Sequence, residues 1–160
     1  MSILRLELPD LNATQRLGAL LALDLSASDV IALSGALGAG KSALARAIIQ
    51  AANPGEMDVP SPTFTLVQTY ELQDGTPLWH LDLYRIESPA EAMELGLEDA
   101  FIDAACLIEW PERLEKLLPK DSLSIYLHLS HENDPDDVRY VDIIAPPHWI
   151  ARVQAVIAKF

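Results

Sequence analysis

Eight consecutive residues in the first third of the chain have the types and spacing of a phosphate-binding loop. Residues 35–42 read Gly-Ala-Leu-Gly-Ala-Gly-Lys-Ser and match the pattern G-x-x-x-x-G-K-[ST] at every fixed position. Glycines let such a loop turn its backbone N–H groups towards phosphate oxygens, and the following helix presents its positive N-terminal end to the same anion. Lys41 can then reach the β- and γ-phosphates, and the hydroxyl of Ser42 can bind Mg²⁺. The segment predicts a site for Mg-ATP.

Two acidic residues are candidates to complete this site, because a phosphate-binding loop needs an acid at a strand end to hold Mg²⁺. Glu109 follows the apolar run 104–108, which is the usual layout for that acid. Asp82 follows His80 by two residues, so both share one face of a predicted strand. We expect Glu109 to bind the metal and Asp82 to act behind it or to orient the attacking water. The sequence also allows these two roles to be exchanged.

A hydroxyl-rich segment, Ser61-Pro-Thr63-Phe-Thr65, lies between the predicted loop and the next strand. Many phosphate-binding-loop proteins keep a switch there, whose hydroxyl senses the γ-phosphate or Mg²⁺. Thr63 is the candidate for that role, and an ordinary loop with capping hydroxyls is the alternative. Trp110, beside Glu109, could report nucleotide state, although a packed tryptophan is the commoner explanation.

The elements that position these residues alternate between strands and helices. Residues 30–33 form an apolar run that predicts a buried strand ending at Gly35, and residues 41–52 have the composition of a helix. Further strands are expected at 4–8, 64–71, 78–84, 104–108, 123–129 and 138–144, and further helices at 111–118 and from 147 onward. This order predicts an α/β protein with the P-loop NTPase fold, a mixed parallel and antiparallel sheet flanked by helices, in one domain over residues 1–160.

Two helix starts can be assigned from capping residues. Asn12 or Thr14 can cap a helix whose leucines form an apolar stripe. In the tetrapeptide 88–91, Ser88 can cap, proline occupies the first helical position, and Glu91 can reach back to the preceding backbone. That helix is expected to end at Gly96.

The composition limits the partners. Lys and Arg number 11 against 24 Asp and Glu, a formal net charge of −13, which disfavours direct binding of a nucleic acid backbone.

The single cysteine, Cys106, excludes an internal disulfide and fits a reducing cytoplasm. The first residues lack the features of a signal peptide, and no apolar stretch approaches the roughly 20 residues that span a bilayer. We expect a cytoplasmic protein with no membrane partner. The histidines at 128, 131 and 148 show no metal-ligand spacing.

Taken in order, Lys41, Thr63, Asp82 and Glu109 resemble the residues of the bacterial tRNA threonylcarbamoyladenosine biosynthesis ATPases, the TsaE (YjeE) family. The resemblance runs from about Leu8 to Leu114. It rests on several segments: Pro9–Thr14 followed by Leu17-Gly18, then residues 35–42, 61–64, 80–85 and 107–112.

The resemblance implies a slow ATPase that is more effective in a complex with two partner proteins, the transferase TsaD and its paralogue TsaB. That complex modifies the adenosine beside the anticodon in tRNAs that read codons starting with A, so tRNA is contacted only indirectly. The family pattern implies that Ser42 and Glu109 hold Mg²⁺, that Asp82 is needed for hydrolysis, and that Thr63 lies in the switch. ATP would be bound by Leu11 and Thr14 near the adenine and by the loop residues Gly38, Ala39, Gly40, Lys41, Ser42 and Ala43.

Two departures from the family pattern are visible. Ser42 replaces the more usual threonine and keeps the hydroxyl. The Gly-Arg pair expected before the last strand is replaced by Asp134-Pro-Asp-Asp137, so the resemblance does not extend to this loop.

Two other functions remain open. A small-molecule P-loop kinase can be this short, but it usually needs an arginine-rich lid, and the seven arginines here are scattered. A nucleotide-dependent binding switch would need no useful hydrolysis, and the presence of both acids argues against it. A GTPase is disfavoured because neither N-K-x-D nor D-x-x-G occurs in the chain.

Overall fold

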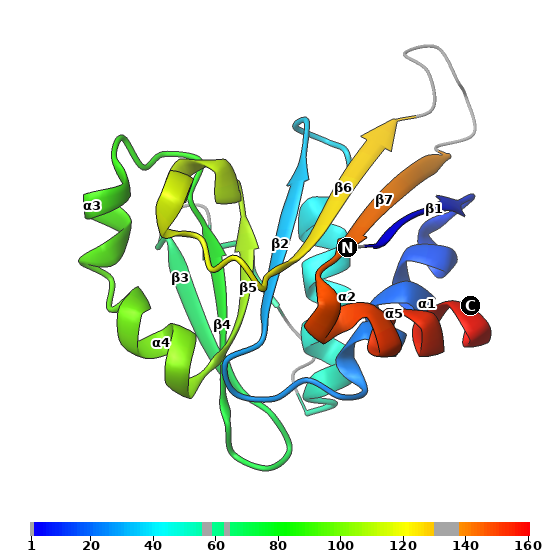
Figure 1. Cartoon of the computed structure of the whole chain (residues 1–160), viewed down its shortest axis with the longest axis horizontal. Helices are drawn as coiled ribbons and strands as arrows, with labels where there is room; N and C mark the ends of the chain where they lie inside the picture. The colour runs from blue at the N-terminus through cyan, green and yellow to red at the C-terminus, as the bar shows by residue number, and fades with distance from the viewer. Residues whose placement is uncertain (1, 56–58, 63–64, 130–137) are drawn as a thin grey trace.

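A seven-stranded sheet runs through the centre of the molecule in the order β1-β7-β6-β2-β5-β4-β3 (Figure 1). The structure is a computed structural model that describes residues 2–55, 59–62, 65–129 and 138–160. The strands β2, β4, β5 and β6 run parallel to one another, whereas β1, β3 and β7 are antiparallel to their neighbours. This confirms the predicted mixed sheet. The strands are β1 Ser2–Leu8, β2 Val30–Gly35, β3 Val67–Glu71, β4 Pro77–Asp82, β5 Ala105–Glu109, β6 Leu123–Leu129 and β7 Arg139–Ala145.

Helices cover the two faces of the sheet with separate apolar cores. The helices α1 (Leu11–Ala22), α2 (Lys41–Ala52) and α5 (Pro147–Lys159) share one core with the sheet. The shorter helices α3 (Pro89–Met93) and α4 (Leu97–Asp103) share the other core with the 3₁₀ helix η1 (Pro111–Leu117). Within the described residues, none of the helices combines the length and apolar character needed to cross a membrane.

The alternation of side chains along the strands decides which residues enter these cores. In β6, Leu123, Ile125 and Leu127 are buried towards α1 and α2, while Tyr126 between them is exposed. Close packing of α1 on α2 depends on Gly18, because a Cβ atom there would lie 2.5 Å from the Cβ of Ala47. These contacts hold α1 closely against α2, the helix that follows the predicted phosphate-binding loop.

The cap of α1 differs from the prediction. The helix begins at Leu11, and the carboxylate of Asp10 accepts a hydrogen bond from the backbone of Ala13 at 2.8 Å. Neither Asn12 nor Thr14 is the cap, because both lie inside the first turn, and Thr14 is buried. Asp10 takes this role because its extended backbone lets an acceptor of suitable length meet the free N–H groups.

The region after β4 also differs from the prediction. Ser88 makes no side-chain cap bond, while Glu91 does reach back and accepts from the backbone of Glu87 at 2.9 Å. The first helix ends at Met93, and a second helix, α4, begins after Gly96. The sequence did not reveal α4, whose seven residues hold too few apolar repeats for a periodic signal. Residues 111–117 form a 3₁₀ helix, interrupted by the positive φ of 51° at Glu115.

Candidate functional site

The carboxyl ends of three neighbouring parallel strands bring the predicted chemical residues to one edge of the sheet. Glu109, the last residue of β5, pairs with Leu33 of β2 on one side and with Asp82 of β4 on the other. The loop that follows Gly35 leaves β2 at this edge and enters α2 at Lys41. Asp82 of β4 and Glu109 of β5 therefore lie next to the loop formed by residues 36–40.

Gly35 is required where this loop begins. Its φ is +144°, and a Cβ atom there would lie 2.6 Å from the backbone oxygen of Leu127 in β6. A backbone atom cannot move aside as a flexible side chain can, so only glycine allows the loop to start against β6.

The loop and the acids enclose an open cleft of about 350 Å³, which we call the P-loop cleft. Most of the predicted phosphate and metal residues line it. The lining residues are Leu37, Gly38, Gly40, Lys41, Ser42, Ala43, Asp82, Tyr84, Arg85, Glu109 and Trp110.

The other predicted site residues lie elsewhere. Ala39 belongs to the loop, but its side chain is buried in the apolar core. Leu11 and Thr14 lie in the first turn of α1, where Leu11 is exposed and Thr14 is buried, and neither contributes to the described lining of the P-loop cleft. Thr63 and the loop 134–137 lie outside the described residues, so their predicted roles stay predictions.

Glu109 is the most connected acid of the cleft. Its side chain is 2% exposed. The hydroxyl of Ser42 donates to Oε1 at 2.8 Å, and Nε2 of His80 lies 2.7 Å from Oε2. The carboxylate therefore bridges the start of α2 and the strand β4.

Lys41 points back onto the loop. Its ammonium group donates to the backbone oxygen of Gly35 and, at 3.0 Å, to that of Ala36. It also lies 4.2 Å from the centre of the Trp110 ring, a cation–π contact. Burial lowers the pKa of Lys41, and the charges of Glu109, Glu112 and Asp82 oppose that shift. The contacts with carbonyl oxygens can be exchanged for contacts with phosphate oxygens.

Aromatic side chains close one side of the P-loop cleft, which the sequence did not clearly predict. Trp110 adopts a left-handed backbone, with φ at +59°, and its ring contacts that of Tyr84 at 4.9 Å between centroids. Arg85 joins them in lining the cleft, while Arg139 donates to the backbone oxygen of Gly38 at 3.4 Å. The sequence signal for these two aromatic residues was their closeness to the acids, because Tyr84 lies two residues beyond Asp82 and Trp110 directly follows Glu109.

Asp82 is held at the end of β4 by the turn that follows it. Its Oδ1 accepts from the backbone of Tyr84 at 3.0 Å, and its own backbone N–H donates to the oxygen of Leu66 at 3.0 Å. Leu66 in turn donates to Pro62 at 2.6 Å. Leu66, the residue directly after the predicted switch segment, is thus bonded both to Pro62 of that segment and to the backbone of Asp82.

The oxygen atoms of the P-loop cleft suit Mg²⁺. The Ser42 hydroxyl and the Glu109 carboxylate lie 2.8 Å apart, and Asp82 lines the same cleft. Mg²⁺ usually binds one or two protein oxygens together with substrate phosphates and water. Among the described ranges, no group of three His, Cys, Asp or Glu could hold a metal ion alone. The donor set therefore fits a metal shared with a phosphate ligand.

Comparison with known proteins agrees with this geometry. The chain has the P-loop NTPase fold: the crystal structure of YdiB from Bacillus subtilis superposes with a TM-score of 0.78 and 25% identity, covering 99% of this chain and 96% of that one. The family model for threonylcarbamoyl adenosine biosynthesis protein TsaE matches residues 8–139. The chain belongs to the TsaE family, which takes part in tRNA threonylcarbamoyladenosine biosynthesis.

Curated relatives carry the same family name. The tRNA threonylcarbamoyladenosine biosynthesis protein TsaE of Rickettsia felis is 41% identical over 75% of this chain and 70% of its own length. The protein of that name from Haemophilus influenzae is 36% identical over 79% of this chain and 76% of its own.

Proposed function

We propose that this TsaE family member binds Mg-ATP in the P-loop cleft and hydrolyses it in support of tRNA threonylcarbamoylation, in a complex with TsaD and TsaB. The observation that carries the proposal is the contact between Ser42 and Glu109 at 2.8 Å, directly beside Lys41 at the start of α2. This arrangement joins the phosphate-binding loop to the acid of the neighbouring strand, as a nucleotide-bound metal requires.

The binding step follows from the loop and α2. Backbone N–H groups of residues 38–43 and the N-terminal end of α2 attract the phosphates. Lys41 exchanges its carbonyl partners, Gly35 and Ala36, for β- and γ-phosphate oxygens. Ser42 and Glu109 would hold Mg²⁺, which would supply positive charge next to the phosphate oxygens.

The hydrolysis step is in-line attack of water on the γ-phosphorus. The water oxygen forms the new P–O bond, the bond to the bridging oxygen breaks, and ADP leaves with that electron pair, while the proton of the water passes to phosphate or solvent. Asp82 orients the attacking water from the end of β4. Lys41 and the loop amides stabilise the charge that spreads over the phosphoryl oxygens.

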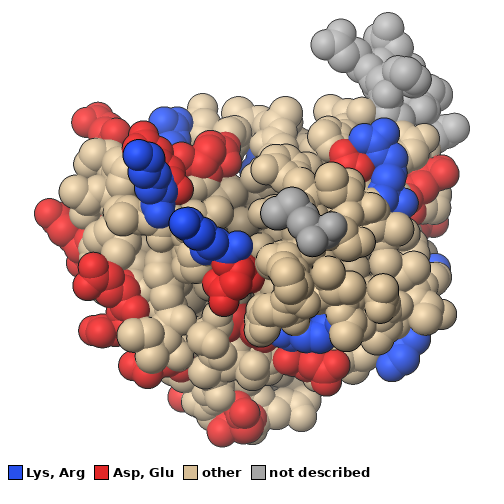
Figure 2. Space-filling view, viewed as in Figure 1, with Lys and Arg blue, Asp and Glu red and all other residues tan. Residues whose placement is uncertain are grey.

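Surface charge supports an indirect relation to tRNA. On the face shown in Figure 2, acidic side chains gather over the side that carries α3 and α4, while lysine and arginine side chains are scattered. The net charge is −13. Such a chain is suited to bind basic partner proteins that contact the tRNA themselves.

Phosphate release from Mg-ATP tests the proposal, with the protein alone and with purified TsaD and TsaB, and with Lys41→Ala as the control. We expect slow release alone, faster release with the partners, and loss of both in the variant. Release that the partners do not change would contradict the role in the complex.

Product analysis in the same assay separates the two rival functions. A phosphorylated small molecule in place of free phosphate would favour the kinase. Nucleotide binding without any release would favour the binding switch.

A further inference from the structure

A buried histidine outside the predicted site contacts the proposed metal-binding acid. His80 lies in β4 and is 1% exposed, and its Nε2 is 2.7 Å from Oε2 of Glu109. An ionised carboxylate only accepts hydrogen bonds, so the ring nitrogen is the donor. The contact joins side chains of the adjacent strands β4 and β5, and Glu109 lines the P-loop cleft.

Two donors from different elements fix the Glu109 carboxylate. Ser42, at the start of α2, donates to Oε1, and His80 donates to Oε2. A single donor would leave the carboxylate able to turn about its side-chain bonds. With both donors present, the plane of the group is set, and its remaining lone pairs have fixed directions.

Within the described residues, the hydrogen bonding of the His80 ring is confined to its contact with Glu109. Nδ1 is buried and has no hydrogen-bond partner among the described residues. A buried polar atom without a partner costs free energy of folding. The polar contribution of His80 is therefore its bond to Glu109.

We propose that His80 is a positioning residue that aims Glu109 at the nucleotide-bound Mg²⁺. It acts through Glu109 and touches neither nucleotide nor metal. Groups behind the ligands of a metal site commonly set ligand orientation, and their loss lowers metal affinity about 10- to 100-fold. This inference rests on the proposed function, since it presumes that Mg²⁺ and nucleotide bind in the P-loop cleft.

Two substitutions of similar polarity separate positioning from packing. In His80→Gln the amide nitrogen can reach the place of Nε2 and still donate to Glu109. In His80→Asn the side chain is one bond shorter, so its amide falls short of that carboxylate. The pair differs mainly in whether the donor reaches Glu109.

The measurement is the affinity for a non-hydrolysable ATP analogue, AMP-PNP, by calorimetry, with Mg²⁺ and with EDTA. We define the magnesium gain as the ratio of these two affinities. We expect His80→Gln to keep the wild-type magnesium gain and His80→Asn to lose about 10-fold of it. Affinity in EDTA should be the same in all three proteins, because Lys41 and the loop amides are unchanged. A melting curve of each protein provides the check on folding.

Several outcomes would overturn the proposal. One is a full magnesium gain in His80→Asn, and another is an equal loss in both variants. If His80→Asn is too unstable to purify, His80→Met takes its place, since it fills the site without a donor and the same loss is expected. Wild-type protein that binds no nucleotide would refute the proposed function itself, and the role of His80 with it.

Discussion

Two carboxylates at opposite ends of the parallel strands are equally buried and have different surroundings. Asp29 immediately precedes β2, Glu109 ends β5, and each is 2% exposed. A buried charge must be compensated by partners, so each needs an explanation. Their partners show that one belongs to a closed structural network and the other to an open site.

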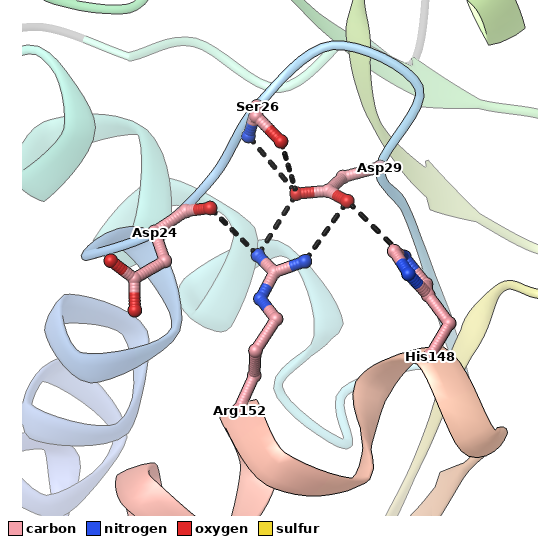
Figure 3. A network of polar contacts seen from close by, with 5 residues as sticks. All are labelled: Asp24, Ser26, Asp29, His148 and Arg152. Carbon is pink, nitrogen blue, oxygen red and sulfur yellow. Dashed lines mark hydrogen bonds and ion pairs between the residues drawn. The ribbon is translucent and has the colours of Figure 1, made fainter.

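Both carboxylate oxygens of Asp29 are bound by neighbouring donors, and we call this group of contacts the closed network (Figure 3). Arg152 of α5 donates to both carboxylate oxygens at 3.0 and 2.9 Å, and the backbone of Ser26 donates at 3.0 Å. His148 approaches at 3.5 Å. Arg152 also binds the backbone oxygen of Asp24 and lies over the ring of Trp149. These contacts attach the C-terminal helix to the beginning of β2.

The surroundings of Glu109 are open by comparison. Its side chain contacts Ser42 and His80, and it lines the P-loop cleft beside Lys41 and Asp82. Because Asp29 and Glu109 are equally buried, burial alone does not identify a functional carboxylate. What distinguishes Glu109 is that its spare acceptor capacity faces a cleft.

Breaking the closed network gives the largest expected effect on stability. In Asp29→Ala, Arg152 loses a bidentate partner and stays partly buried, so we expect the free energy of unfolding to fall by about 3 kcal/mol. Nucleotide affinity of the folded protein should stay unchanged, because the network lies at the far end of β2. Urea denaturation and calorimetry measure the two quantities. A loss of nucleotide affinity without a loss of stability would show that Asp29 serves binding and not the stability of the fold.

A substitution of Glu109 in the P-loop cleft should have the opposite result, a large loss of activity with a smaller loss of stability. Glu109→Gln keeps the size of the side chain but removes its charge and replaces one of its two acceptor oxygens with a donor. We therefore expect phosphate release to fall at least about 100-fold, while the melting temperature falls less than in Asp29→Ala. Phosphate release and a thermal melt test this. Asp29→Asn is the matched control, in which the charge is removed from the closed network. Similar activity of Glu109→Gln and wild type would show that the acid does not serve catalysis.

A smaller signal is expected from movement of Lys41 when nucleotide binds. If Lys41 leaves the Trp110 ring to bind phosphate, tryptophan fluorescence should change on addition of Mg-ATP. Trp110→Phe should lose this change, whereas Trp149→Phe, in the region of the closed network, should keep it. A change that survives in Trp110→Phe would place the moving contact elsewhere.

The smallest effect is expected at a third carboxylate with the same kinds of partners. Asp142 accepts from Arg5 at 2.6 and 2.7 Å and contacts His128 at 2.9 Å, but the Arg5 side chain is 66% exposed. Hydrogen bonds from Arg5 hold the pKa of Asp142 below its usual value. A lowered pKa gives stability that is present above the ordinary value and lost as pH falls below about 4.

Solvent screening should make that contribution small. Thermal melts of Arg5→Ala against wild type are expected to differ slightly at pH 7 and not at all near pH 2. A large difference at pH 7 would show that exposure does not separate this pair from the network of Asp29.

The sequence predicts best where one local pattern determines the structure. The loop 35–42, the helix 41–52 and the acids at two strand ends follow from local spacing and from the rule that parallel strands end together. The cap at Asp10 and the short helix α4 do not, because helix boundaries and short helices leave weak periodic signals.

Contacts between distant segments need the folded structure. The bond from His80 to Glu109 depends on the register of β4 against β5. Alternation placed His80 on the same face as Asp82 but could not pair it with Glu109. The ion pair between Asp29 and Arg152 spans 123 residues and has no local signature. His148, which shows no metal-ligand spacing in the sequence, is half-exposed and lies 3.5 Å from Oδ1 of Asp29.

Binding of Mg-nucleotide in the P-loop cleft through Lys41 underlies the proposed function. Calorimetric titration of AMP-PNP with Mg²⁺ into wild-type protein and Lys41→Ala tests it most directly, with Asp29→Asn as a control from the other end of β2. We expect saturable one-to-one binding by wild type and by the control, and a loss of at least about 100-fold in Lys41→Ala, because a buried charge contact with phosphate is removed. Equal affinity of wild type and Lys41→Ala would show that Lys41 does not bind the nucleotide.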